Sequence, residues 1–143
     1  MSRNCRFAVA VHVAALLADC AGTPVTSDWI ASSVNTHPVV VRRTLAALAR
    51  AGLVHSQRGT TGGSSLARAP QRITLLDLYH ATEEQDPQAL HHQAPNPRCP
   101  VGANIIPLLA GILSRAERAK QEELAKTTVA DVVEALHRLA ATG

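Results

Sequence analysis

Four arginines in the first half of the chain could bind a polyanion. Arg42 and Arg43 are adjacent, and Arg58 and Arg68 lie on either side of a glycine-rich segment, residues 59–63. A guanidinium group can donate two parallel hydrogen bonds to a phosphate or to the edge of a guanine base. Segment 59–63 has too many glycines to pack in a core but is suited to lie against a sugar-phosphate backbone. These residues therefore predict a DNA-binding surface.

The residues around these arginines predict the elements that would hold them in place. Residues 27–34 begin with good capping residues and indicate a short helix, which ends in the turn 35–37. Residues 38–50 indicate a second helix, with a proline suited to its first position. Residues 53–58 and 64–68 are typical of two strands joined by the glycine-rich segment. Helix, turn, helix and hairpin in this order form a winged helix-turn-helix.

The second helix of this motif has two faces with different chemistry. Val41, Leu45 and Leu48 recur at helical spacing and predict a buried stripe, while Val39 and the arginine pair lie on a second stripe. The predicted DNA contacts are Ser27, His37, Val39, Arg42, Arg43, Arg58, Thr60, Thr61, Gly62 and Gly63. Two alternatives stay open, a basic face that is merely solvated and a winged helix that docks a protein without binding DNA.

Composition restricts the core, and the charge is unevenly distributed. Of the 143 residues, 46% are hydrophobic but only 2% are aromatic, so we expect a modest core of Ala, Val and Leu in a mainly helical chain. Residues 1–72 hold eight arginines against two aspartates, a net charge of +6. Residues 73–143 hold six Arg or Lys against nine Asp or Glu, a net charge of −3. The basic half is therefore the half with the predicted winged helix.

The N-terminal segment superficially resembles a bacterial lipoprotein signal ending at Cys20. However, His12 interrupts its apolar run, and Asp19 occupies the place where such signals need a small neutral residue. We therefore expect a soluble amphipathic helix and no membrane-spanning segment. Cys5 and Cys20 would lie about 20 Å apart on this helix, too far to pair within one chain, and Cys99 is an odd third cysteine. This cysteine usage favours the reducing cytoplasm.

The second half of the chain predicts further helices. Residues 74–77 resemble a capping box, residues 83–98 indicate a long polar loop, and residues 128–131 would cap a last helix. Residues 100–126 show a long helical pattern, in which Pro107 should produce a kink or delay the regular start. Apolar residues in this helix recur at coiled-coil spacing and predict a homodimer seam. The seam residues are Ile105, Leu109, Ile112, Ala116 and Ala119.

Together these motifs resemble the Rrf-type winged-helix transcriptional regulators, the bacterial family that includes IscR, NsrR, CymR and, most similar here, the YwnA-like branch. The matching segments are residues 6–9, 38–43, 52–54, 58–63, 66–68, 73–77 and 96–102. The resemblance implies a mainly α fold, in which a winged helix-turn-helix with a small two-stranded wing is followed by a long C-terminal dimerisation helix. It also implies a cytoplasmic homodimer that binds operator DNA, and we expect this protein to be a repressor and not an enzyme. A two-fold dimer predicts that the operator in double-stranded DNA is an inverted repeat.

One departure from this family concerns the cysteines. Iron–sulfur members carry three cysteines in the loop before the long helix, whereas Cys99 stands alone in that loop here. We therefore expect no iron–sulfur cluster and no other cofactor. Cys99 follows Arg98 and precedes the predicted start of the long helix, and both neighbours favour a thiolate. Cys99 is therefore the predicted sensor of redox or electrophile stress.

Other roles for these residues stay open. His12, His91, His92 and Cys99 have the donor chemistry for a metal, but their spacing matches no recognisable site. Cys99 as an enzyme nucleophile would need a base at a recognisable spacing, which the sequence does not offer. Control by a small molecule bound elsewhere is a further alternative. The predicted parts are a winged-helix domain (1–83), a loop with the sensor cysteine (84–99), and the dimerisation helix with the last helix (100–143).

Overall fold

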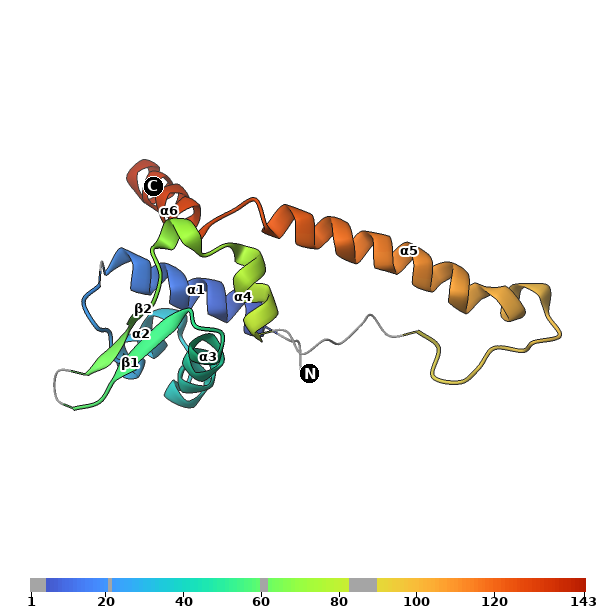
Figure 1. The fold of residues 1–143 in the computed structure, drawn as a ribbon, viewed down its shortest axis with the longest axis horizontal. Coiled ribbons are helices and arrows are strands. Elements are labelled where there is room, and N and C mark those ends of the chain that lie inside the picture. The colour runs from blue at the N-terminus through green and yellow to red at the C-terminus, as the bar shows by residue number, and fades with distance from the viewer. Residues whose placement is uncertain (1–4, 21, 60–61, 83–89) are drawn as a thin grey trace. The chain divides into compact units, whose positions relative to one another are not determined.

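The computed structural model describes residues 5–20, 22–59, 62–82 and 90–143 (Figure 1). The elements in chain order are α1 (Arg6–Asp19), α2 (Ser27–Val34), α3 (Pro38–Arg50), β1 (Val54–Gln57), β2 (Gly63–Leu66), the 3-10 helix η1 (Pro70–Arg72), α4 (Leu75–Thr82), α5 (Pro100–Leu124) and α6 (Val129–Thr142). They fall into two compact units, Met1–Glu83 with Leu124–Gly143, and Glu84–Glu123. The mainly helical architecture with a two-stranded wing and a long helix is the fold class that the sequence predicts.

The core of the first unit is aliphatic and centres on α1. Ala10, Val13 and Ala14 of α1 are completely buried, and α1 packs against α2, α3 and α4. The largest fully buried side chains include Leu17, Ile30, Leu48, Leu53, Ile73 and Leu78. Burial of each such side chain stabilises the fold by about 1.5–3 kcal/mol. Phe7 and Tyr79 meet edge to face, with 5.6 Å between their ring centroids, at the side of this core.

Capping interactions fix the boundaries of the helix-turn-helix. Thr26 Oγ1 accepts a hydrogen bond from a backbone N–H in the first turn of α2 (3.2 Å), and Asn35 ends this helix in the left-handed conformation (φ 61°). His37 Nδ1 accepts a hydrogen bond from Val39 N (3.1 Å) at the start of α3. These acceptors satisfy N–H groups that have no partner within their helix. The turn lies where the sequence predicts it because these signals are local.

The later helices follow their predicted start signals. The reciprocal hydrogen bonds of a capping box occur in residues 74–77 and again in residues 128–131, with lengths of 2.9 and 3.1 Å in each box. α5 is continuous over 25 residues, so Pro107 lies inside the helix and does not delay its start. No side chain of α5 is buried in a single copy of the chain. Among the described helices, none is both long and apolar enough to cross a membrane.

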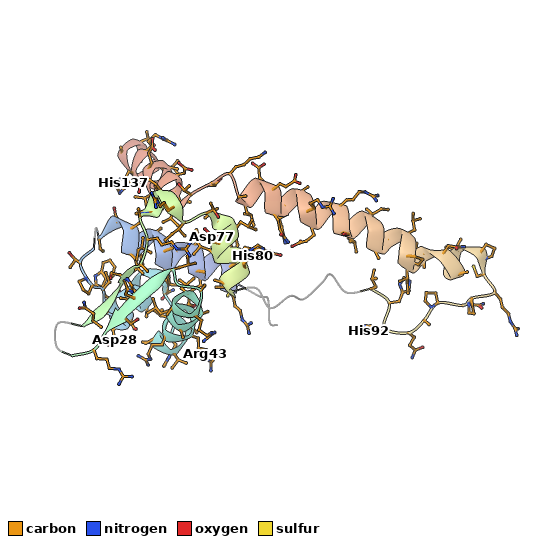
Figure 2. The ribbon with its side chains drawn as sticks, viewed as in Figure 1. Asp28, Arg43, Asp77, His80, His92 and His137 are labelled. Atoms are coloured by element: carbon orange, nitrogen blue, oxygen red, sulfur yellow. The ribbon has the colours of Figure 1, made fainter. Side chains whose placement is uncertain are left out.

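α6 packs with the first unit. The predicted division of the chain instead placed this helix together with the long helix, in residues 100–143. Val129 N donates a hydrogen bond to Ile73 O (2.8 Å), and the Val129 side chain is buried. Farther along, His137 Nε2 lies 2.7 Å from Asp19 Oδ1, and α6 runs beside α1 (Figures 1 and 2). These contacts join residues far apart in the chain. Local periodicity therefore could not reveal them.

The wing is a short hairpin tied to the segment before α2. β1 pairs with β2 in antiparallel register. Val25 adds a further pair of backbone hydrogen bonds to this sheet, Val25 N to Ser64 O (2.9 Å) and Ser64 N to Val25 O (2.8 Å). The two backbones approach so closely that a Cβ atom on Gly63 would lie 2.8 Å from backbone atoms of Val25. The glycine at position 63 is thus required by packing.

The variant Gly63→Ala should lower the free energy of unfolding by about 1–3 kcal/mol, because Val25 cannot move away without losing its hydrogen bonds to Ser64. Ser65→Ala, in the same strand, is the matched control and should change that free energy by less than about 0.5 kcal/mol. Chemical denaturation of both variants measures the difference. Equal denaturation midpoints would show that the wing is not held against residue 25.

Candidate nucleic-acid interface

α3 presents its basic face to solvent because its other face is buried. Val41, Leu45 and Leu48 are at most 5% exposed and belong to the core around α1. Arg42 and Arg43 are exposed, and neither side chain has a hydrogen-bond or ion-pair partner among the described residues. Figure 2 shows Arg43 on the outer side of α3. The two guanidinium groups are therefore available to an external anion.

An open groove of about 430 Å³ lies between α3 and the wing. Three parts of the first unit line it, namely the start of α2, one side of α3 and the wing hairpin. The lining residues are Thr26, Ser27, Arg42, Leu45, Ala46, Ala49, Ser56, Gln57, Gly59, Gly62, Gly63 and Ser64. Arg42 lines the groove, whereas its neighbour Arg43 does not. The adjacent arginines thus face different surroundings.

The glycines at the wing tip are required by the turn itself. Gly59 has a positive φ of 105°, and Gly62 N donates a hydrogen bond to Gly59 O (3.0 Å) across the described part of the turn. A Cβ atom on Gly62 would collide with the carbonyl oxygen of Gln57. Arg58 is exposed at the end of β1. The other two predicted wing contacts, Thr60 and Thr61, lie outside the described residues.

Several of the predicted contacts share the groove, and others lie beside it on α3. Those in the groove are Ser27, Arg42, Gly62 and Gly63. Val39 is 38% exposed in the first turn of α3, next to the cap formed by His37. Sequence reasoning missed Ser56 and Gln57, which also line the groove. The signal for them was the polar run in the predicted first strand of the wing.

Cys99 lies at the N-terminus of α5 with its side chain exposed. Hydrogen bonds from the backbone N–H groups of Gly102 and Val101 hold the pKa of the Cys99 thiol below its ordinary value. The sequence also suggested a contribution from the Arg98 guanidinium, which is not among the causes of this shift. Asn96 shapes the preceding turn, since its carbonyl accepts a hydrogen bond from Cys99 N (3.2 Å). The lowered pKa increases the thiolate fraction at neutral pH.

The model of the Rrf2 family, described as iron-dependent transcriptional regulators, matches residues 3–135. The chain belongs to the Rrf2 family. It is 40% identical over 130 residues to the HTH-type transcriptional regulator YwnA of Bacillus subtilis (strain 168), an alignment that covers 91% of this chain and 96% of YwnA. These relatives identify a DNA-binding transcriptional regulator rather than an enzyme, as the sequence predicts.

Solved structures support the Rrf2 fold over almost the whole chain. A transcriptional regulator from Lactobacillus plantarum has a TM-score of 0.77 at 28% identity, with 94% of this chain and 91% of that chain covered. CymR, titled the global cysteine regulator of B. subtilis, has a TM-score of 0.68 at 24% identity, with 94% of this chain and 97% of that chain covered. The likeness to CymR concerns the fold alone.

The three cysteines of this Rrf2 member bear on whether it could hold an iron–sulfur cluster. Such clusters are held mainly by several cysteine thiolates. Cys5 and Cys20 flank α1 in the first unit, and Cys99 belongs to the second unit. In the described ranges, no three His, Cys, Asp or Glu side chains gather where they could hold a metal ion. His12, a candidate ligand from the sequence, lies instead 3.0 Å from the Ser33 hydroxyl.

Proposed function

We propose that this Rrf2 protein is a homodimeric repressor that binds an inverted-repeat operator in double-stranded DNA. The observation that supports this most directly is the outer face of α3, where Arg42 and Arg43 are exposed and have no partner among the described residues. A recognition helix reads base edges in the major groove, and arginine binds guanine bidentately. The wing and the start of α2 supply contacts that position the protein on the backbone.

The exposed apolar side chains of α5 support the homodimer. Val101, Leu108 and Ile112 are 68%, 63% and 45% exposed in a single copy, which leaves apolar area in water along the helix. A 25-residue helix is about 37 Å long, so a second copy of α5 could cover these side chains over several turns. The proposed seam is Ile105, Leu109, Ile112, Ala116 and Ala119. Its alanines would let the two backbones approach closely.

A two-fold dimer determines the form of the operator. Each protomer inserts one recognition helix, so the two half-sites form an inverted repeat on one face of the duplex. Their centres are about 34–36 Å apart when they occupy successive turns of the major groove, or a multiple of that distance.

The double variant Arg42→Ala, Arg43→Ala should weaken operator binding by at least about 2 kcal/mol, or roughly 30-fold, because each lost arginine contact costs about 1–3 kcal/mol. Fluorescence anisotropy with a duplex selected by the parent protein measures the affinity. The control is Arg72→Ala, Arg138→Ala, which removes the same charge from η1 and α6 and should change affinity far less. Unchanged affinity in the first variant would eliminate α3 as the DNA-reading element.

Ile112→Glu should convert the dimer to a monomer, because it places a charge on each side of an apolar seam. Sedimentation at micromolar concentration measures the mass. Ser114→Glu, on another side of the same helix, is the matched control and should leave the dimer intact. A parent protein that sediments as a monomer, or an Ile112→Glu variant with unchanged mass, would rule out the α5 dimer.

We propose further that Cys99 lets oxidants control this binding. A thiolate sulfur forms a bond to one oxygen of a peroxide as the O–O bond breaks and the other oxygen leaves as water, which gives a sulfenate. The sulfur caps the first turn of α5, so its oxidation changes the start of the proposed dimer helix. A shift of that helix would alter the distance between two recognition helices and mismatch them with successive grooves.

In a Cys5→Ser, Cys20→Ser background, alkylation of Cys99 should show a pH midpoint below the ordinary cysteine value of about 8.5, because two backbone N–H groups stabilise the thiolate. Peroxide should release this protein from its operator but leave the Cys99→Ser variant bound, as anisotropy would record. A midpoint at the ordinary value, or equal release of both proteins, would assign the sensing role to another group.

We also propose that this regulator works without an iron–sulfur cluster, because Cys99 is the single cysteine in the loop before α5. Two other functions compete with the redox model. Operator binding that ignores peroxide but responds to a metal or metabolite would favour an effector site. Failure to bind any duplex from a random library would instead favour a winged helix that docks a protein.

A further inference from the structure

Arg42 and Arg43 are neighbours in sequence but point to different sides of α3. Successive residues of an α-helix are about 100° apart around its axis. Arg42 lies on the side that carries Ala46 and Ala49, at positions i+4 and i+7, and all three line the groove beside the wing. Arg43 is in register with Val39, four residues earlier, and neither lines the groove. The two arginines therefore meet different parts of any DNA docked on this face.

The groove has the chemistry of a site for a sugar-phosphate strand. The polar side chains of its lining that have no partner among the described residues are those of Ser27, Arg42 and Gln57. The hydroxyl groups of Ser56 and Ser64 bond to each other at 3.1 Å. The donors come from α2, α3 and the wing respectively, so they surround the groove and could bind phosphate oxygens along a strand.

The shape of the groove favours a polymer over an enclosed small molecule. Most residues of its lining are exposed to solvent, including Arg42, Ala46, Ala49 and Gln57. A typical small-molecule pocket instead buries most of its ligand among apolar side chains. The small alanine side chains on the α3 wall, and the glycines on the wing wall, let a deoxyribose and its phosphate come close to the protein backbone.

The surface around Arg43 has a different chemistry. Val39 is 38% exposed in the first turn of α3, the part of a recognition helix that contacts base edges. An apolar side chain gains little from a phosphate but can contact the C5-methyl group of thymine. Arg43, one turn later on the same side, can donate two hydrogen bonds to O6 and N7 of a guanine.

We propose that the two arginines have separate targets. Arg42, with Ser27 and Gln57, holds the phosphates of one DNA strand in the groove, whereas Arg43 reads a guanine and Val39 contacts a thymine methyl group. This division rests on the proposed operator binding. It predicts that Arg42 contributes affinity without sequence preference, and that Arg43 and Val39 determine which bases are preferred.

The test uses the 143-residue chain and a duplex that the parent protein selects from a randomised library. Arg42→Ala should weaken binding to this duplex and to an unrelated duplex by a similar factor, about 5- to 150-fold, and should select the same sequence motif as the parent. In a plot of log affinity against log salt concentration, the slope for this variant should be shallower by about 0.9 per protomer. Gln57→Ala should weaken both duplexes alike, without the change in salt slope.

Arg43→Ala should instead lose affinity for the selected duplex while its affinity for the unrelated duplex changes far less. When this variant selects duplexes from the randomised library, the selected motif should lose the preference for one guanine in each half-site. Replacing thymine with deoxyuridine in the selected duplex should weaken binding by the parent protein. The same replacement should not change binding by Val39→Ala, because that variant has already lost the contact with the methyl group.

Lysine variants provide the matched controls, since lysine keeps the charge but not the bidentate geometry. Arg42→Lys should retain most of the affinity and the motif, whereas Arg43→Lys should lose the guanine preference. Thermal unfolding confirms that each variant is folded. The proposal of separate targets is wrong if both alanine variants lose sequence preference. It is also wrong if both bind all duplexes more weakly by a similar factor. If neither affects DNA binding, operator recognition through α3 fails as well.

Discussion

The rotation of α3 about its own axis is the constraint on which the exposed basic surface depends. Val41, Leu45 and Leu48 are buried in the core around α1. Their burial favours this rotation over one that exposes them by roughly 5–9 kcal/mol. The same rotation turns Arg42 and Arg43 outward. Apolar contacts on one side of the helix thus position charges on the other, so the guanidinium groups need no internal partner and stay free for a ligand.

Features that depend on residues close together in the sequence were predictable. Features that join segments far apart in the sequence were not. The turn before α3 and its buried stripe follow from residues within two helical turns of one another. The groove depends on the pairing of Val25 with Ser64, which brings the wing beside the start of α2. No local pattern encodes that pairing, so Gln57 was missed. For the same reason the sequence could not separate Arg42, which lines the groove, from Arg43, which does not.

The chemistry of Cys99 depends on backbone geometry rather than on a neighbouring charge. Its thiol is tuned by the N–H groups of Val101 and Gly102, and a side chain at position 102 would collide with the carbonyl of Asn96. Backbone N–H groups do not titrate, and salt screens a direct hydrogen bond less than it screens the field of an exposed guanidinium. The reactivity of the thiol therefore depends on the folding of the N-terminal end of α5. Any change that unwinds the first turn of α5 would also lower this reactivity.

The chain leaves the first unit after α4 and returns to it at α6, so the second unit is an insertion within the first. The return is fixed by the hydrogen bond from Val129 to Ile73 and by the burial of Val129. The winged-helix body therefore closes its own core with the last helix of the chain. Such an insertion can vary in length and sequence while the body keeps its structure.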